Sequence, residues 1–308
     1  MKKNYLKIFA AALMAVGSLC AQAEEVVVLE ENFDNLENAM KDGKHLLSKN
    51  PWTGTDAEGV SYQPNFTNFT NDGHGELLNG WSSVTGYLYP CQGFVRISKT
   101  NYGGDLVSPA LSALNKATDV QLSYQAIGYT SNVTLAEDGS YKSGLKHDYQ
   151  FYCVGVIGGG EIEGATKTKT LTFAGAEVTC AVMEVPTNSF ITMDTTAAWG
   201  FEGTKKQLTI KGATGSTQIV FASMIPGVKT TTYATTEFPI ATDAEHGVNN
   251  AVNRIIFDNI KVSYEEVPTA VEDINAAVAP KTRKVIENGQ VYIIAGDKKF
   301  NVMGAEVK

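Results

Sequence analysis

Apolar and polar residues alternate with a period of two along much of the chain, most cleanly at residues 120–126. Side chains of a strand point alternately to its two faces, so this pattern predicts a strand with one face in the core. The side predicted to face the core holds Val120, Leu122, Tyr124 and Ala126. Similar runs, read as further strands, occupy residues 26–33, 93–98, 150–157, 170–173, 177–185, 190–193, 207–211, 218–225 and 254–264.

Sustained helical periodicity is missing from the sequence. Residues 36–47 have room for a helical turn or two, and the Asn- and Thr-rich residues 65–73 are read as a loop carrying two aromatic rings. Glycine clusters such as residues 158–160 and 212–215 separate several of the apolar runs. Many short strands with turn signals between them are typical of a sandwich or jelly roll. We therefore predict an all-β protein whose main domain, residues 24–265, is a jelly-roll β-sandwich.

One acidic residue interrupts an apolar row near each end of this domain. The first row holds Val27, Leu29, Glu31 and Phe33, and the second holds Ile256, Asp258, Ile260, Val262 and Tyr264. A carboxylate on a core face is costly unless it is paired or bound to a metal. Glu31 and Asp258 are therefore predicted to share a cation. The alternative is that a strand bulges and turns one of the acids toward water.

Three short motifs resemble those of secreted modules called cleaved-adhesin or choice-of-anchor J domains, which are akin to MAM and carbohydrate-binding jelly rolls. The motifs are Glu-Asn-Phe-Asp at 31–34, Gly-Asp-Leu-Val-Ser-Pro-Ala-Leu at 104–111 and Phe-Asp-Asn-Ile-Lys-Val at 257–262. The resemblance spans roughly residues 26–265 and implies a structural calcium between the first and last strands. Calcium takes six to eight oxygen ligands, so backbone carbonyls and a further acid, Asp34 or Asp105, are expected beside Glu31 and Asp258.

The C-terminal residues form a separate segment by composition. Residues 266–283 carry acids and prolines but no aromatic residue and are read as a linker, whereas residues 284–308 contain alternating runs divided by the turn dipeptides Asn288-Gly and Gly296-Asp. We expect three short strands, too few for a normal domain. The ending at 301–308 resembles the sorting tails that the type IX secretion machinery of Bacteroidota reads, although the Asn-Pro common in such tails is missing. A purely structural tail is the alternative.

The N-terminus has the layout of a signal peptide. Lys2, Lys3 and Lys7 precede an apolar run, and Ala21-Gln-Ala23 fits cleavage before Glu24. A lipoprotein anchored through Cys20 is the competing interpretation. Cleavage at 23 would leave 22 basic and 33 acidic residues, a net charge of −11, which argues against nucleic acid as a partner. The rest of the chain has no apolar run long enough for a membrane-spanning helix.

Cys91, Cys153 and Cys180 remain after cleavage, an odd number that allows at most one internal disulfide. Cys153 and Cys180 lie in apolar runs and are interpreted as buried thiols. The sequence shows no cysteine or histidine spacing typical of zinc. The four histidines lie outside recognised catalytic motifs, although Asp72-Gly-His74 places an acid and an imidazole in one loop. We predict no enzymatic activity.

Aromatic residues suggest a ligand, because flat rings stack on the apolar faces of sugars. Trp52, Trp81, Tyr87 and Tyr89 are the predicted binding residues, with Phe66 and Phe69 nearby; the alternative is that they belong to the core. The leading hypothesis is a secreted or cell-surface, non-catalytic module that binds a glycan or a host or surface protein. The alternatives are a structural surface protein without a small ligand and a hydrolase.

Overall fold

A computed structural model describes residues 24–49, 56, 58–131, 146–185, 190–191, 205–240, 247–266 and 282–307. The predicted all-β sandwich is confirmed. The larger sheet has ten strands, and its central path runs β10 (Glu161–Ile162), β14 (Lys205–Ala213), β7 (Thr118–Ser131), β17 (Ile255–Glu266), β5 (Phe94–Ile97) and β4 (Leu88–Cys91). Joined to this path are β1 (Glu24–Glu31) on β17, β13 (Phe190–Ile191) and β8 (Lys146–Asp148) on β7, and β16 (Gly247–Asn249) on β8. First and last strands of the domain are therefore neighbours.

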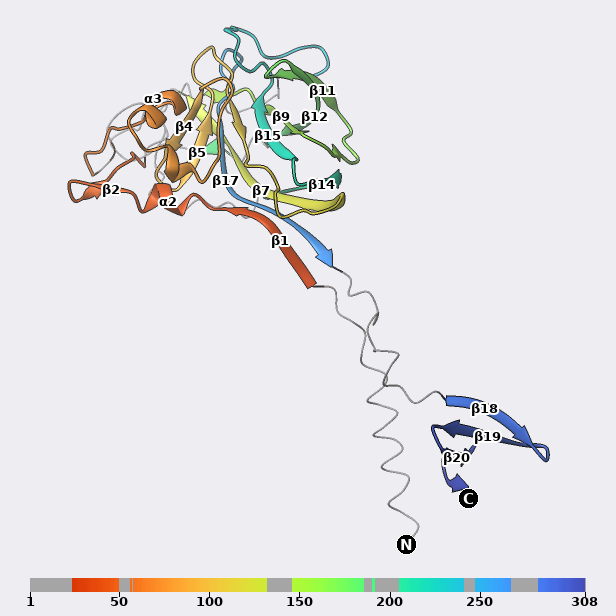
Figure 1. Ribbon diagram of the computed structural model, residues 1–308. Coiled ribbons are helices and arrows are strands. Elements are labelled where there is room, and N and C mark those ends of the chain that lie inside the picture. The colour runs from red at the N-terminus through yellow and green to blue at the C-terminus, as the bar shows by residue number, and fades with distance from the viewer. Residues whose placement is uncertain are drawn as a thin grey trace, which may run out of the picture. The chain divides into compact units, whose positions relative to one another are not determined.

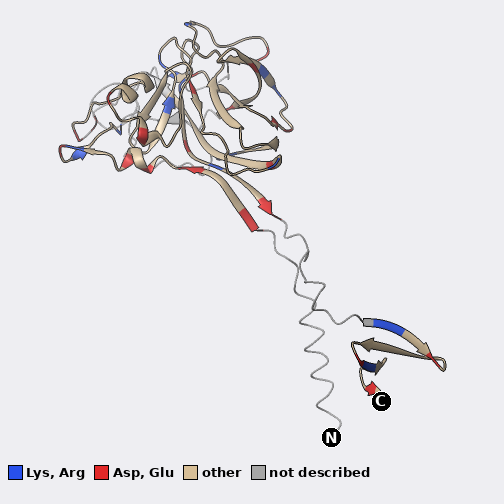
Figure 2. Ribbon diagram, viewed as in Figure 1, with Lys and Arg blue, Asp and Glu red and all other residues tan. Residues whose placement is uncertain are grey.

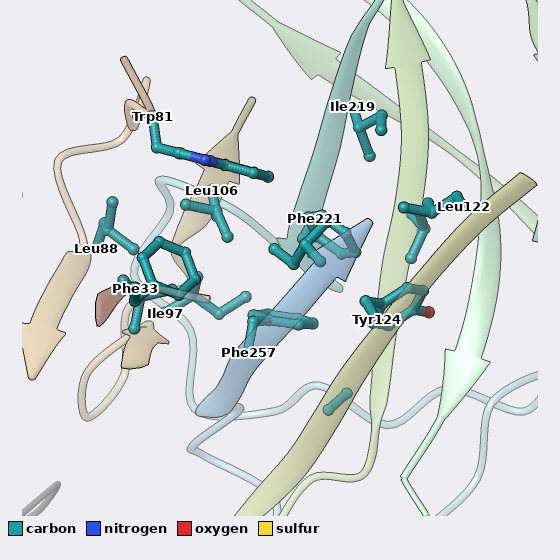
Figure 3. Close-up of a cluster of buried hydrophobic side chains, with 14 of the residues drawn as sticks. Phe33, Trp81, Leu88, Ile97, Leu106, Leu122, Tyr124, Ile219, Phe221 and Phe257 are labelled. Atoms are coloured by element: carbon teal, nitrogen blue, oxygen red, sulfur yellow. The ribbon is translucent and has the colours of Figure 1, made fainter. Parts of the chain in front are cut away.

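The smaller sheet packs against the larger one, as Figure 1 shows for β15 and β9 opposite β7 and β17. Its order is β11 (Thr168–Phe173), β12 (Ala176–Glu184), β9 (Phe151–Ile157), β15 (Gln218–Ser223) and β6 (Asp105–Val107). Phe221 of this sheet lies 4.9 Å from the Tyr124 ring and 4.8 Å from the Phe257 ring of the larger sheet (Figure 3). These aromatic contacts between sheets account for much of the core.

The inward face predicted for residues 120–126 is confirmed. The hydrophobic core of the sandwich contains all four of these β7 residues: Val120, Leu122, Tyr124 and Ala126. The buried Tyr124 hydroxyl is satisfied by the Tyr152 hydroxyl at 3.0 Å.

The alternation predicted for the last strand is wrong, because β17 contains a β-bulge. Its pairing with β7 shifts between Asp258 and Lys261, and Asn259 takes a left-handed conformation with φ of 48°. Ile255 and Phe257 therefore face the core before the bulge, and Ile260 and Val262 face it after the bulge. A bulge adds one residue to one strand and reverses the phase of the faces. Asp258 consequently lies on the opposite side of the sheet from Ile260.

Between β1 and β4 the chain forms small elements at one end of the sandwich. They are α2 (Asp34–Glu37), the hairpin of β2 (Met40–Lys41) and β3 (Lys44–His45), α3 (Phe66–Asn71) and a 3-10 helix, η1 (Gly75–Leu78). The loop predicted at 65–73 is mostly the helix α3, whose first turn is capped by Asn65 Oδ1 accepting from the Asn68 N–H at 2.9 Å. Asparagine at this position satisfies an N–H that the helix leaves unpaired. Phe69 is thereby carried into the core.

The C-terminal segment forms a separate compact unit, because its residues make their contacts within a group that excludes residues 25–264. It is a four-stranded antiparallel sheet of β18 (Thr282–Glu287), β19 (Gln290–Ala295), β20 (Lys298–Asn301) and β21 (Glu306–Val307). The sequence predicts three strands here, whereas the structure has four, because a turn at residues 302–305 divides the last predicted strand into β20 and β21. Asn288 and Gly289 both have positive φ, as the predicted tight turn requires.

All three cysteines of the described chain are free thiols and buried. Burial raises the pKa of Cys91 and that of Cys180 to about 12, so both stay protonated. Among the residues described, no helix has the length and apolar character needed to cross a membrane. The predicted signal peptide, residues 1–23, lies outside the described residues.

Candidate functional site

Acidic side chains gather where β1 leads into α2 beside β17, and their ribbon segments appear red around α2 in Figure 2. Burial, together with the negative charges of Asp34, Glu31 and Glu37, raises the pKa of Asp258 to about 7. A hydrogen bond from the Asn259 N–H, 2.7 Å long, acts in the opposite direction. The structure therefore brings the predicted pair and Asp34 into one electrostatic environment and adds Glu37, which the sequence reasoning missed.

These acids fit a bound cation by charge, because a divalent ion would relieve their mutual repulsion and the desolvation of Asp258. Part of their hydrogen-bonding capacity is already used: Glu31 accepts from the Phe33 N–H at 2.7 Å and from Asn79 Nδ2 at 2.9 Å. In the described ranges no three acidic, histidine or cysteine side chains already converge in metal-ligand geometry. Backbone carbonyls would have to supply the remaining ligands.

Asp105, the other candidate for a third ligand, is engaged elsewhere. It is fully buried and accepts hydrogen bonds from the Val84 N–H and the Thr85 N–H, both at 2.8 Å, and from the Ser83 hydroxyl at 3.1 Å. A carboxylate satisfied by several donors is a stable anchor even when buried. The Gly-Asp motif thus fixes the loop before β4. Gly104 belongs to the same anchor, because a Cβ there would lie 2.2 Å from the Tyr87 carbonyl oxygen.

The predicted aromatic binding residues do not form one platform. Trp81 is only 2% exposed and packs against Phe33 in the core with a ring distance of 6.0 Å (Figure 3), so its prediction as a ligand-binding residue is wrong. Burying the large apolar surface of the indole inside the sandwich stabilises the fold more than leaving it exposed at a loop tip would. Trp52 lies outside the described residues.

Tyr87 and Tyr89 are partly exposed but point their rings at cations of the protein itself. Lys99 Nζ lies 4.7 Å from the centre of the Tyr87 ring, and the Arg96 guanidinium carbon lies 4.3 Å from that of Tyr89. Tyr87 also packs against Tyr102 at 5.2 Å. These cation–π contacts occupy ring faces that a sugar would need.

A pocket of about 420 Å³ lies among the small elements between β1 and β4. Its lining residues are Lys41, Leu46, Tyr62, Asp72 and His74. The volume falls in the range of small-molecule sites, about 300–1,000 Å³. We call this the Tyr62 pocket. Of its residues, the sequence analysis had singled out only the Asp72-Gly-His74 loop.

Local turns place these side chains. The β2–β3 hairpin turns at Asp42 and Gly43, both with positive φ, so Lys41 pairs with Lys44 and the chain returns to Leu46, whose N–H donates to the Ala39 carbonyl at 2.7 Å. Asp72 ends α3, where its N–H donates to the Asn68 carbonyl at 2.8 Å. Gly73 then turns the chain with φ of 86°, which an L side chain would disfavour.

His74 is held by the helix it follows. Its N–H donates to the Phe69 carbonyl at 3.1 Å, and its ring lies 5.5 Å from the ring of Phe69. The same imidazole meets the Tyr62 ring edge-on at 6.2 Å. The buried Phe69 therefore anchors one wall of the pocket to the core.

A hydrogen bond within the protein holds two polar groups of the pocket in place. The Tyr62 hydroxyl donates to Asp72 Oδ2 at 2.5 Å. Burial and this contact with the carboxylate hold the pKa of Tyr62 far above its usual value, so the phenol remains a proton donor. The fixed carboxylate presents acceptors, Lys41 and His74 offer nitrogen atoms, and Leu46 supplies an apolar floor. Tyr62 lies 10 positions before Asp72, and Leu46 and Lys41 lie further back in the sequence, so no local motif joins these residues to the Asp72 loop.

Known proteins give no independent indication of function. No profile of a protein family matches the chain, and no curated protein matches it significantly. The functional assignment therefore depends on the geometry of the chain itself.

Proposed function

We propose that the protein is a non-catalytic carbohydrate-binding module of the jelly-roll type, acting outside the cell, and that the Tyr62 pocket receives a sugar residue. The observation that carries the proposal is the Tyr62–Asp72 hydrogen bond beside an apolar floor. Sugar hydroxyls donate and accept at once, so a carboxylate next to nitrogen donors matches a pair of neighbouring hydroxyls. Leu46 and the Tyr62 ring would meet the C–H surface of the sugar.

Binding is favoured over hydrolysis by the number of acids in the pocket. Most glycoside hydrolases use two carboxylates that flank the scissile bond. Asp72 is the single carboxylate among the described lining residues, and it already accepts a hydrogen bond from the Tyr62 hydroxyl. The pocket therefore lacks, among its described lining residues, the second carboxylate that this mechanism requires.

A glycan array followed by calorimetric titration tests this proposal. We expect Asp72→Asn and Tyr62→Phe to weaken binding of the best array ligand, by about tenfold for the loss of a charge-assisted contact. Glu76→Gln is the matched control, since Glu76 is exposed on the neighbouring η1 and outside the pocket lining. Equal affinity for Asp72→Asn, Glu76→Gln and the unmodified protein would exclude this pocket as the glycan site.

We further propose that a calcium ion joins Glu31 and Asp258, with Asp34 or Glu37 contributing. The support is the repulsion that surrounds Asp258 and raises its pKa. The cation would stabilise the connection between the first and last strands, β1 and β17, which are already neighbours in the larger sheet.

Export through the signal peptide and recognition of the C-terminal unit by a secretion machinery complete the proposal. Four apolar side chains on that unit support a docking role: Ile286, Ile293, Val302 and Met303, of which Met303 is 81% exposed. Such exposure also fits the second candidate function, a structural surface protein that binds another protein through this unit. Removing residues 266–308 distinguishes them: a sorting tail predicts accumulation in the periplasm, whereas unchanged export favours the structural role.

A further inference from the structure

One face of the C-terminal sheet exposes large apolar side chains to water. Directly opposed residues of antiparallel strands share a face. By the register of the four strands, the central residues of this face are Lys284, Ile286, Val291, Ile293, Phe300 and Glu306. Ile286 is 70% exposed and Ile293 is 44% exposed. We call this surface the Ile293 face.

The opposite face of the same sheet is covered by its own polar side chains. Lys299 Nζ lies 4.2 Å from the centre of the Tyr292 ring and forms an ion pair with Glu287. The Tyr292 hydroxyl donates to Gln290 Oε1 at 2.8 Å. Contacts within the sheet therefore satisfy this side, whereas the Ile293 face leaves aliphatic surface in water.

The small size of the sheet makes an uncovered apolar face costly. Its strands lie within residues 282–307, and a unit below about 40 residues usually needs a disulfide, a metal or association for stability. Residues 266–308 contain neither cysteine nor histidine, so a disulfide and the usual ligands of a zinc site are missing from this part of the sequence. Association of the Ile293 face with a second surface is the route that its apolar residues support.

A row of residues across the Ile293 face is complementary to the same row in a second copy. From β18 to β21 the row reads Lys284, Ile293, Phe300 and Glu306. A two-fold axis parallel to the strands reverses this order in the second sheet, so each Lys284 faces Glu306 and each Ile293 faces Phe300 of the other copy. Glu306 pairs with Lys298 of its own sheet at 3.2 Å through one carboxylate oxygen, and the other oxygen can accept from Lys284 of the second copy. Opposite charges thus meet at both edges, with apolar groups between them.

We propose that the Ile293 face is a self-association surface, through which two copies of the chain form a symmetric dimer. The two sheets would stack face to face about 10 Å apart, as the sheets of a β-sandwich do, and bury Ile286, Ile293 and Phe300 in a shared core. The proposal does not depend on what the Tyr62 pocket binds. A dimer would carry two such pockets, and a ligand with several sugar residues could then engage both.

Sedimentation equilibrium of the predicted mature chain, residues 24–308, tests the proposal at about 0.1 M ionic strength. We expect a monomer–dimer equilibrium, and a chain ending at residue 265 should remain monomeric. Lys284→Glu and Glu306→Lys should each weaken the dimer about tenfold or more, because each change places like charges opposite one another at both edges. Arg283→Glu is the matched control, since Arg283 is exposed on β18 but belongs to the opposite face, and it should leave the dimer unchanged.

Mixing the two charge-reversed variants separates this arrangement from general stickiness and from misfolding. In a mixed pair, the acid introduced by Lys284→Glu faces the base introduced by Glu306→Lys, and the native Lys284 and Glu306 face each other at the other edge. An equal mixture should therefore regain the dimer that neither variant forms alone. A monomer at every concentration, which would assign the face to a different partner, would overturn the proposal. So would a dimer that survives in the chain ending at residue 265, or one that the two charge reversals leave unchanged, or a loss that mixing does not restore.

Discussion

Replacing Asp258 by Asn tests the acid cluster, because this change removes the charge and keeps the shape of the side chain. The pKa of Asp258 is raised from 3.8 to about 7 in the folded protein by burial and neighbouring acids. The folded state therefore binds the proton more tightly than the unfolded state does. Without a cation, stability should be lost as the pH rises from about 4 to about 7, and Asp258→Asn should remove that loss.

The magnitude follows from the size of the pKa change. The full difference between 3.8 and about 7 is equivalent to about 4 kcal/mol. Asp258 is only partly buried, so solvent screening reduces the effect, and we expect about 1–2 kcal/mol at about pH 8. Calcium bound only to the folded state should add about 3 kcal/mol at a hundredfold excess over its Kd. Asp258→Asn should lose most of this gain.

Urea unfolding at about pH 5 and about pH 8, each with calcium or with a chelator, measures both effects. At the higher pH with chelator, the Asp258→Asn variant should be more stable than the unmodified protein, and calcium should reverse this order. Glu31→Gln should reduce the calcium response as well, and the double variant should lose little more because both acids act through one ion. If chelation leaves the unmodified protein unchanged and its stability does not depend on pH, the account of this cluster is refuted.

Three further predictions concern stability. Asp105→Ala should cost about 2–4 kcal/mol in urea unfolding, because the half-buried loop at Ser83–Thr85 loses the buried acceptor of its hydrogen bonds; a cost below about 0.5 kcal/mol would contradict this anchor. Trp81→Ala should destabilise the domain by about 3–5 kcal/mol through loss of core packing, whereas a ligand-binding Trp81 would change affinity alone. A chain ending at residue 265 should keep cooperative thermal unfolding, since the C-terminal sheet makes its own contacts; a lost transition would make that sheet part of the core.

The strands and the sandwich were predictable because alternation reports directly on a half-buried strand. Residues 120–126 illustrate this, since every residue predicted to face inward is buried. The bulge at Asn259 was not predictable from the same rule. It depends on a left-handed backbone conformation that asparagine tolerates, and one extra residue reverses every face that follows.

The candidate sites were less predictable, because they depend on residues that only the fold brings together. Trp81 and Tyr87 lie six positions apart, yet one is in the core and the other packs under Lys99 near the surface. Sequence alone could not distinguish them, since an aromatic ring suits a core and a binding surface equally well. The contact between Tyr62 and Asp72 depends on α3, which ends at Asp72 in a stretch whose Asn- and Thr-rich sequence predicts a loop.

The most direct test of carbohydrate binding is an NMR titration of the isotope-labelled protein with the best array ligand. The proposal predicts that the largest chemical-shift changes centre on Leu46, Tyr62, Asp72 and His74, and that Asp72→Asn reduces them. It also predicts that the glycan stays intact throughout the titration. Shift changes confined to other parts of the domain, or signals of a cleaved glycan, would contradict the proposed function.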